Sequence, residues 1–246
     1  MIMTFLSAHG PANDIHIAVR YDAGMMRRLL LVLLLAVFPA LLLSQAATHP
    51  VTGRQIAGVA GDWVWLDRSE REQEEEPKRA VELIGIKPGM VIADVGAGTG
   101  YFTVMLSQRV GPEGKVYAND IQPKLLGILQ DKIQKQKLTN IEVVQGRQDD
   151  ARLPEATIEL ALLVDVYHEF QYPQAMLASI RRSLKPSGLL VLLEYRKEDR
   201  DLPIREEHKM SIKDARAEVE AEGFAFDRVI RSLPRQHILI FRKPAQ

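Results

Sequence analysis

A short glycine-rich stretch constrains the fold of this chain more than any other feature. The segment 91–95 is apolar except for Asp94, glycines follow at positions 96, 98 and 100, and an amphipathic helix pattern begins directly afterwards. This order predicts a strand that turns sharply into a helix, as in the first unit of a nucleotide-binding α/β domain. Glycines permit backbone angles and a close approach of ligand that a Cβ atom would block. Asp94 would be unfavourable beside a pyrophosphate, and it suits a ligand with an ammonium group and a hydroxylated ribose.

Strand and helix patterns alternate along the rest of the chain. We expect helices at residues 68–84, 102–110, 123–137, 174–184 and 211–222, and strands at residues 91–95, 115–119, 141–144, 158–164, 189–193, 224–230 and 237–242. The alternation predicts an α/β fold with a doubly wound, mostly parallel seven-stranded sheet and helices on both faces. The last two strands are joined by a short connection, so the last strand is expected to be antiparallel.

The motif Asp-Val-Gly-Ala-Gly-Thr-Gly at residues 94–100 resembles the first motif of the class I S-adenosylmethionine-dependent methyltransferases. The resemblance covers roughly residues 68–243, because the sheet of that family also ends with a strand inserted antiparallel. It implies transfer of a methyl group from S-adenosylmethionine to a small-molecule acceptor. One alternative is an exported, non-catalytic protein that retains the fold. Another is a nicotinamide-dependent oxidoreductase, which Tyr101 disfavours because it stands where a dinucleotide fingerprint places its third glycine.

The resemblance also implies which residues hold the cofactor. Asp120 follows the second predicted strand and would accept hydrogen bonds from the ribose hydroxyls, with a helix N-cap as the alternative role. An acid after the third strand would meet the adenine amino group, and Asp149 is preferred to Asp150 although Arg147 departs from the usual Gly-Asp pattern. The full predicted set is Asp94, Gly96, Gly98, Gly100, Asp120, Asp149 and Asp165.

The methyl acceptor is expected beside the stretch Asp165-Val166-Tyr167-His168-Glu169, at the end of the fourth predicted strand. His168 is the natural general base because its unperturbed pKa is close to neutral, although a role as pocket wall or a purely structural role stays open. Tyr167 and Glu194 complete the predicted catalytic set, with pairing to Arg196 as the alternative for Glu194. Asp165, His168, Glu169 and His208 lack a recognisable ligand spacing, so no metal site is predicted.

The N-terminal region has the pattern of a signal peptide. Arg27 and Arg28 precede an apolar run over residues 29–43, and Ser44-Gln45-Ala46 suits cleavage after Ala46. An uncleaved membrane anchor and a buried helix are the alternatives. The predicted organisation is a leader over residues 1–46, a linker over residues 47–67 and a methyltransferase-like domain over residues 68–246. Trp63 and Trp65 in the linker could form a lid over the cofactor, or could pack against the helix that follows. The leader predicts an exported or membrane-associated protein, with membrane contact through the apolar run, in conflict with a cofactor made in the cytosol.

Composition excludes several kinds of partner and site. The chain has 32 basic and 32 acidic residues, so its balance does not favour binding to nucleic acid. It has no cysteine, which excludes disulfides, thiolate metal sites and cysteine nucleophiles. The sequence leaves the identity of the acceptor and the oligomeric state open.

Overall fold

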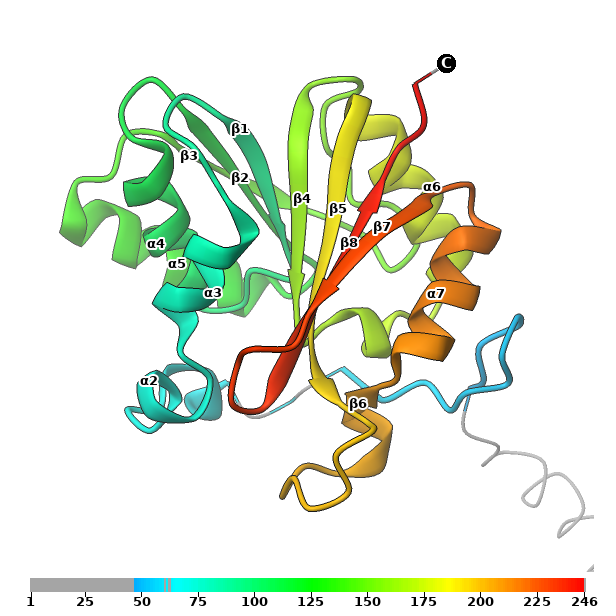
Figure 1. Cartoon of the computed structure of the whole chain (residues 1–246). Helices are drawn as coiled ribbons and strands as arrows, with labels where there is room; N and C mark the ends of the chain where they lie inside the picture. Colours follow the sequence, from blue (N-terminus) through cyan, green and yellow to red (C-terminus); the bar gives the residue numbers. More distant parts are fainter. Residues whose placement is uncertain (1–46, 60, 62, 246) are drawn as a thin grey trace, which may run out of the picture. The chain divides into compact units, whose positions relative to one another are not determined.

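The computed structural model describes residues 47–59, 61 and 63–245, whose centre is one mixed β-sheet (Figure 1). The strand order is β3-β2-β1-β4-β5-β8-β7, and a short strand, β6, pairs with β5 outside this path. The strands are β1 (Val91–Val95), β2 (Lys115–Asp120), β3 (Ile141–Gln145), β4 (Ile158–Val164), β5 (Leu184–Arg196), β6 (Lys209–Met210), β7 (Ala225–Ile230) and β8 (Gln236–Arg242).

Helices precede, connect and follow these strands. They are η1 (Val64–Asp67), α2 (Arg71–Glu74), α3 (Pro77–Ile84), α4 (Tyr101–Val110), α5 (Pro123–Gln136), η2 (Tyr167–Glu169), α6 (Pro173–Ser183), η3 (Glu206–His208) and α7 (Ile212–Ala221). In the view of Figure 1, α3 and α4 lie to the left of β4 and β5, whereas α6 and α7 lie to the right.

The pairing of the strands confirms the predicted fold. β1 pairs in parallel with β2 and β4, and β5 pairs in parallel with β4. β8 is antiparallel to both β5 and β7, so the last strand in chain order lies inside the sheet. Strand β6 was not expected, because its two residues are too few to show a periodic pattern.

Alternation along the central strands builds a core on each face of the sheet. In β4, Leu160 and Leu162 join one apolar cluster, whereas Ala161 and Leu163 join the other. This follows from the two-residue period of a strand, which sends successive side chains to opposite faces. The first cluster includes buried side chains of α3 and α4, and the second includes those of α6 and α7. Both faces of β4 are therefore shielded from solvent, which explains its almost continuously apolar sequence.

Two elements differ from the sequence-based expectation. The helix expected over residues 68–84 is divided, because α2 ends at Glu74 and α3 begins at Pro77. Proline lacks the N–H that a continuing helix would need, and it suits the first position of a new one. Strand β5 begins at Leu184, before the strand that was expected over residues 189–193, and its register against β4 shifts between Ile158 and Leu160.

Part of the segment assigned to a linker packs against α7. The side chain of Arg54 donates from Nε and Nη2 to the two carboxylate oxygens of Glu218, each at 3.0 Å. Thr52 donates its hydroxyl to the same carboxylate, and the ring of His49 lies 3.5 Å from it. Glu218 is fully buried on α7, so its charge is balanced only by this segment among the described residues. The segment 47–57 is thereby fixed to the end of the sheet that carries η2.

The predicted leader over residues 1–46 lies outside the described residues. Within residues 47–59, 61 and 63–245, no helix combines the length and apolar character needed to cross a membrane.

Candidate active site

The carboxyl ends of β1, β2, β4 and β5 face a cavity of about 440 Å³. This volume lies within the range that small-molecule ligands occupy in proteins. Gly96, Gly98 and Asp120 line one part, whereas Asp165 and His168 line another. A smaller cavity of about 60 Å³ adjoins it and shares several of its walls, with Ile121, Gln148 and Met176 among its own lining residues. Ligand sites of open α/β sheets lie at this edge, so the location agrees with the sequence-based expectation.

The glycine turn after β1 is shaped so tightly that side chains are excluded. Gly96 has a φ of 77°, and a Cβ atom there would lie 2.5 Å from Cγ2 of Val166. Gly98, with a φ of 57°, would place a Cβ atom 3.0 Å from Leu66. The backbone can therefore lie directly against the cavity, and the N–H of Gly98 points to Asp120. These features explain why glycine stands at these positions.

Asp120 is held in a fixed orientation at the end of β2. Its carboxylate accepts hydrogen bonds from the backbone N–H of Gly98 at 2.9 Å and of Gln122 at 2.8 Å. Burial raises the pKa of this carboxyl, while the two backbone donors act in the opposite direction. Asp120 lines both cavities, and the N-cap of α5 is Gln122 rather than Asp120. The structure thus leaves the side chain of Asp120 facing a ligand space.

His168 in η2 and Glu194 in β5 form a buried pair. The Nδ1 atom of His168 lies 2.7 Å from one carboxylate oxygen of Glu194, and the other oxygen accepts from the backbone N–H of Tyr167 at 2.9 Å. A carboxylate requires a donor, so Nδ1 carries a proton and the lone pair of neutral His168 is on Nε2. Burial lowers the pKa of His168, but attraction to Glu194 outweighs it and the net shift is upward.

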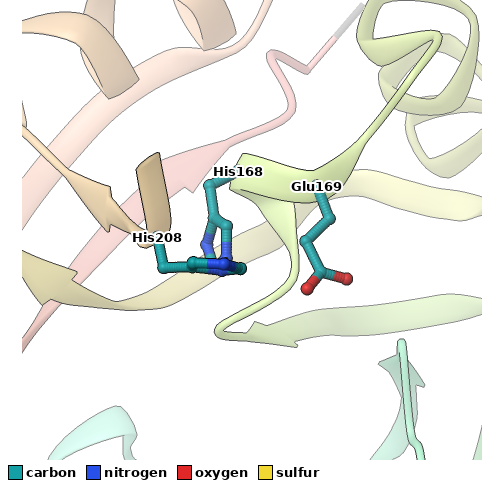
Figure 2. A group of neighbouring side chains, drawn as sticks. All are labelled: His168, Glu169 and His208. Carbon is teal, nitrogen blue, oxygen red and sulfur yellow. The ribbon is translucent and has the colours of Figure 1, made fainter. Parts of the chain in front are cut away.

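Two further polar side chains lie beside His168 (Figure 2). Nδ1 of His208, from η3, is 3.1 Å from Nε2 of His168. Glu169 follows His168 in η2, and ligand atoms of His168, Glu169 and His208 all lie within 4.8 Å of one another. Burial and the neighbouring His168 and Arg205 lower the pKa of His208. The three side chains come from two short helices that pack together at the rim of the sheet.

Comparison with known proteins gives the family. The model of the family "Methyltransferase domain" matches residues 93–192. The solved structure of an S-adenosylmethionine-dependent methyltransferase from Aquifex aeolicus is similar with a TM-score of 0.69 and 28% identity, over 74% of this chain and 96% of that one. Residues 93–192 therefore match a methyltransferase domain, and the surrounding fold is similar to that of a solved S-adenosylmethionine-dependent methyltransferase.

Curated relatives of the methyltransferase domain agree with this assignment. The ubiquinone/menaquinone biosynthesis C-methyltransferase UbiE of Marinomonas sp. is 30% identical over 126 residues, which cover 51% of this chain and 50% of that protein. The protein of the same name from Teredinibacter turnerae is 31% identical over 126 residues, or 51% of each chain. The chain thus spans about half the length of the curated relatives it matches.

Three of the acids that were predicted to bind the cofactor lie in three different environments. They are Asp94, Asp149 and Asp165. Asp94 is buried, accepts a hydrogen bond from the hydroxyl of Thr103 at 2.6 Å, and is not among the residues that line the main cavity. Asp149 is exposed, and Gln148 reaches the smaller cavity in its place. Asp165 lines the main cavity with a φ of 49°. One of its oxygens accepts from Gln236 at 2.7 Å, whereas the other is buried without a hydrogen-bond partner among the described residues.

The predicted catalytic set is only partly brought together. Tyr167 is fully buried with its ring packed against Phe170, and its hydroxyl faces His49 rather than the cavity. Glu194 is fully buried behind His168 and is likewise absent from the cavity wall. Arg196, the alternative partner of Glu194, instead donates to backbone carbonyls, including those of Leu233 and Gln236. Among Tyr167, His168 and Glu194, His168 alone reaches the ligand space.

The segment containing the two tryptophans covers the glycine turn. Trp65 and Leu66 line the main cavity, and Asp67 accepts a hydrogen bond from the hydroxyl of Thr99 at 3.0 Å. Trp65 is stacked under Arg68, whose Cζ lies 3.6 Å from the ring centroid. Trp65 thus lies both at the cavity wall and against the segment that begins the first helical region.

Several cavity residues were not in the predicted site. They are Arg71, Glu169, Tyr195, Arg205 and His208, all of which line the main cavity. The buried carboxylate of Glu75 links two of them, because it accepts from Nε of Arg71 and from the hydroxyl of Tyr195, each at 2.6 Å. Arg71 lies in the charged run over residues 70–76, a pattern that is typical of a solvated helix face. Its burial depends on contacts that no local pattern contains, and a conserved pairing in homologues is the signal that would have found it.

Proposed function

We propose that this protein transfers a methyl group from S-adenosylmethionine to a small-molecule acceptor. One observation carries the proposal. A single cavity joins the glycine turn and Asp120 to the polar cluster around His168. Methyl transfer requires two reactants aligned in one space, and binding both in a fixed arrangement supplies much of the rate enhancement. The cofactor supplies a methyl group on a sulfonium, which is electrophilic without further activation.

The residues present fit this cofactor. Asp120 already has a fixed carboxylate at the cavity wall, which suits hydrogen bonds from two ribose hydroxyls. The unpartnered oxygen of Asp165 is buried beside the cavity, and it suits the ammonium group of the methionine part. Buried polar atoms without partners are rare, so a donor from a ligand would remove an unfavourable feature of the free protein. Gly96 and Gly98 allow the backbone to lie against the same ligand.

The acceptor is then expected at the end of the cavity lined by His168, Glu169 and His208. Glu194 acts as a positioning residue, because it fixes the ring and the tautomer of His168 from behind. The lone pair on Nε2 can either receive a proton from an acceptor hydroxyl or hold a metal ion. The relatives are named for C-methylation in ubiquinone and menaquinone biosynthesis, so hydroxylated aromatic precursors of quinones are the first acceptors to test.

Calorimetric titration of the full chain with S-adenosylmethionine tests the proposal, with NADH as a separate ligand. We expect micromolar binding of the first ligand alone. Asp120→Ala should weaken that binding by about 10- to 100-fold, because hydrogen bonds to a charged group contribute roughly 1.5–3 kcal/mol each. Asp131→Ala, which changes an exposed acid on α5, is the matched control and should bind as the wild type does. Absence of binding would overturn the proposal and favour a non-catalytic protein with the same fold.

We also propose that the N-terminal apolar run directs this protein to an exported or membrane-associated location. Its support is the order of Arg27-Arg28, the apolar segment and Ser44-Gln45-Ala46 in the sequence. N-terminal sequencing of the mature protein, combined with cell fractionation, checks it. An intact N-terminus in the cytosolic fraction would contradict both cleavage and export.

A further inference from the structure

We propose that His168, Glu169 and His208 bind one divalent transition-metal ion, with zinc as the first candidate, at the acceptor end of the cavity. The metal site is argued from these side chains alone, and only its role toward the acceptor rests on the proposed methyl transfer. Two imidazoles and one carboxylate are a ligand set that zinc and its neighbours in the first transition row accept. The sequence shows no ligand spacing for this site, because His208 lies in η3 whereas His168 and Glu169 lie in η2.

The distances suit a shared ion. Zinc binds imidazole nitrogens at about 2.0–2.1 Å, so two nitrogens 3.1 Å apart can hold one ion at an angle of roughly 100°. The carboxylate of Glu169 belongs to the same group of ligand atoms, all within 4.8 Å of one another (Figure 2). Ligand atoms about 2.0–2.2 Å from a tetrahedral zinc ion lie roughly 3.4 Å from one another, so the carboxylate of Glu169 has to move closer to the two imidazoles to complete the set.

Glu194 prepares His168 to act as a ligand. A histidine that binds a metal usually donates its other ring N–H to a carboxylate or a carbonyl, which fixes the tautomer and makes the ligating nitrogen more basic. His168 has this arrangement, with Nδ1 at 2.7 Å from the fully buried carboxylate of Glu194. Nε2 therefore presents its lone pair to His208 and to the cavity. A histidine that served only as packing would not need a buried carboxylate in this position.

A hydrogen bond between the two histidines is the competing arrangement. In it, His208 donates from Nδ1 to Nε2 of His168, and Arg205 donates to Nε2 of His208 at 2.6 Å. The metal requires the other tautomer of His208, so the contact with Arg205 must break. The side chain of Arg205 is 74% exposed, and such a contact contributes little to stability. The same lone pair cannot bind a metal and accept a proton, so a bound ion replaces the role of His168 as a base.

The ion would be exposed to the cavity on one side. Three protein ligands with an open position are typical of catalytic rather than structural zinc. The open position faces the space that the acceptor would fill, where an ionised hydroxyl is a suitable fourth ligand. The geometry thus points to acceptors with an acidic hydroxyl group.

Titration of the untagged full chain with zinc, and separately with cobalt, tests the site. The chain is first treated with a chelator, and calorimetry then gives the stoichiometry and affinity for zinc. Cobalt in a site of low symmetry absorbs visible light, which reports on nitrogen ligation. The variants are His208→Ala and Glu169→Gln, with Glu113→Gln as the matched carboxylate control in the exposed turn before β2. His208 is only partly buried, so its removal is less disruptive than that of His168.

We expect one zinc equivalent in the wild type and in Glu113→Gln, and an affinity at least 10-fold lower in His208→Ala and Glu169→Gln. The cobalt spectrum should be lost in His208→Ala. Equal affinity in all four proteins, or no binding in the wild type, overturns the metal site. Titration with S-adenosylmethionine is independent of this result. Cofactor binding without zinc binding refutes only the metal site, whereas zinc binding without cofactor binding refutes only the proposed methyl transfer.

Discussion

Asp94 is a buried ionisable residue in β1, the strand that leads into the glycine turn. Its side chain is 2% exposed, and burial raises its pKa from 3.8 to about 6 although the hydroxyl of Thr103 stabilises the charge. The folded protein therefore keeps a proton on Asp94 at pH values where the unfolded chain has released it. Folding takes up this proton between about pH 4 and pH 6, so the free energy of unfolding decreases as the pH rises through this range.

Asp94→Asn should remove this dependence on pH. We expect the free energy of unfolding of the wild type, relative to that of Asp94→Asn, to increase by up to about 3 kcal/mol from pH 7 to pH 4, since each pKa unit corresponds to about 1.4 kcal/mol. Urea denaturation of both proteins at several pH values measures the difference, in which most other titrating groups cancel. A difference that stays constant with pH would show that the pKa of Asp94 is the same in the folded and unfolded chain.

Single residues were predictable from the sequence where strand order alone determines their position. Asp120 and His168 follow strands whose carboxyl ends meet at one edge of the sheet, and both line the cavity. Tyr167 is adjacent to His168, yet it points into the core because η2 turns neighbouring side chains in different directions. The orientation of a residue in a short turn depends on the elements packed around it. Adjacency in the sequence therefore predicts the neighbourhood of a residue, whereas the direction of its side chain depends on how η2 packs.

At the scale of an element, Gly96 in the glycine turn and Gly127 in helix α5 should respond in opposite ways to an added methyl group. Gly96→Ala should destabilise the protein by about 1–3 kcal/mol, because the new methyl group would collide with Val166 and the φ of 77° disfavours alanine. Gly127→Ala should stabilise it by about 0.5–1 kcal/mol, since Gly127 is inside α5 with no atom near its added Cβ.

Thermal unfolding of the two variants against the wild type measures both effects. Opposite signs are the expected result. A stable Gly96→Ala protein would mean that the turn relaxes at little cost, and its tight shape would then not explain the glycine.

Most helices and strands could be predicted because the spacing of their apolar residues is visible within the element's own sequence. The division between α2 and α3 was missed although Pro77 marks it, because the charged and apolar residues on both sides continue a helical pattern. The start of β5 was missed because Lys185-Pro186-Ser187-Gly188 reads as a turn. β6 has two residues, too few for any period, and it exists because it pairs with Tyr195 and Arg196 of β5. His208 reaches the site through that pairing, so its place could not be predicted either.

At the scale of the whole molecule, the segment 47–57 is tied to α7 by a buried ion pair. The side chains of Arg54 and Glu218 are 4% and 0% exposed. A buried pair contributes little compared with apolar residues of the same size, but removal of one partner leaves an uncompensated charge. The pair therefore determines where the segment lies more than how stable the fold is.

Arg54→Met should lower the free energy of unfolding by about 3–5 kcal/mol, and Arg54→Met with Glu218→Met should recover a large part of that loss. Denaturant unfolding of the wild type, both single variants and the double variant gives the coupling energy. Additive effects of the two substitutions would contradict the buried pair.

The position of β8 has a consequence for the order of assembly. β8 is the last strand in chain order, yet it separates β5 from β7. During synthesis, β5 is available long before the strand that covers its edge, and β7 cannot join the sheet by itself. The nascent sheet therefore exposes an unpaired edge until residue 242 has left the ribosome, and such edges readily pair with other chains. A chaperone that shields β5 during this interval would cover a strand edge that is open to pairing with another chain.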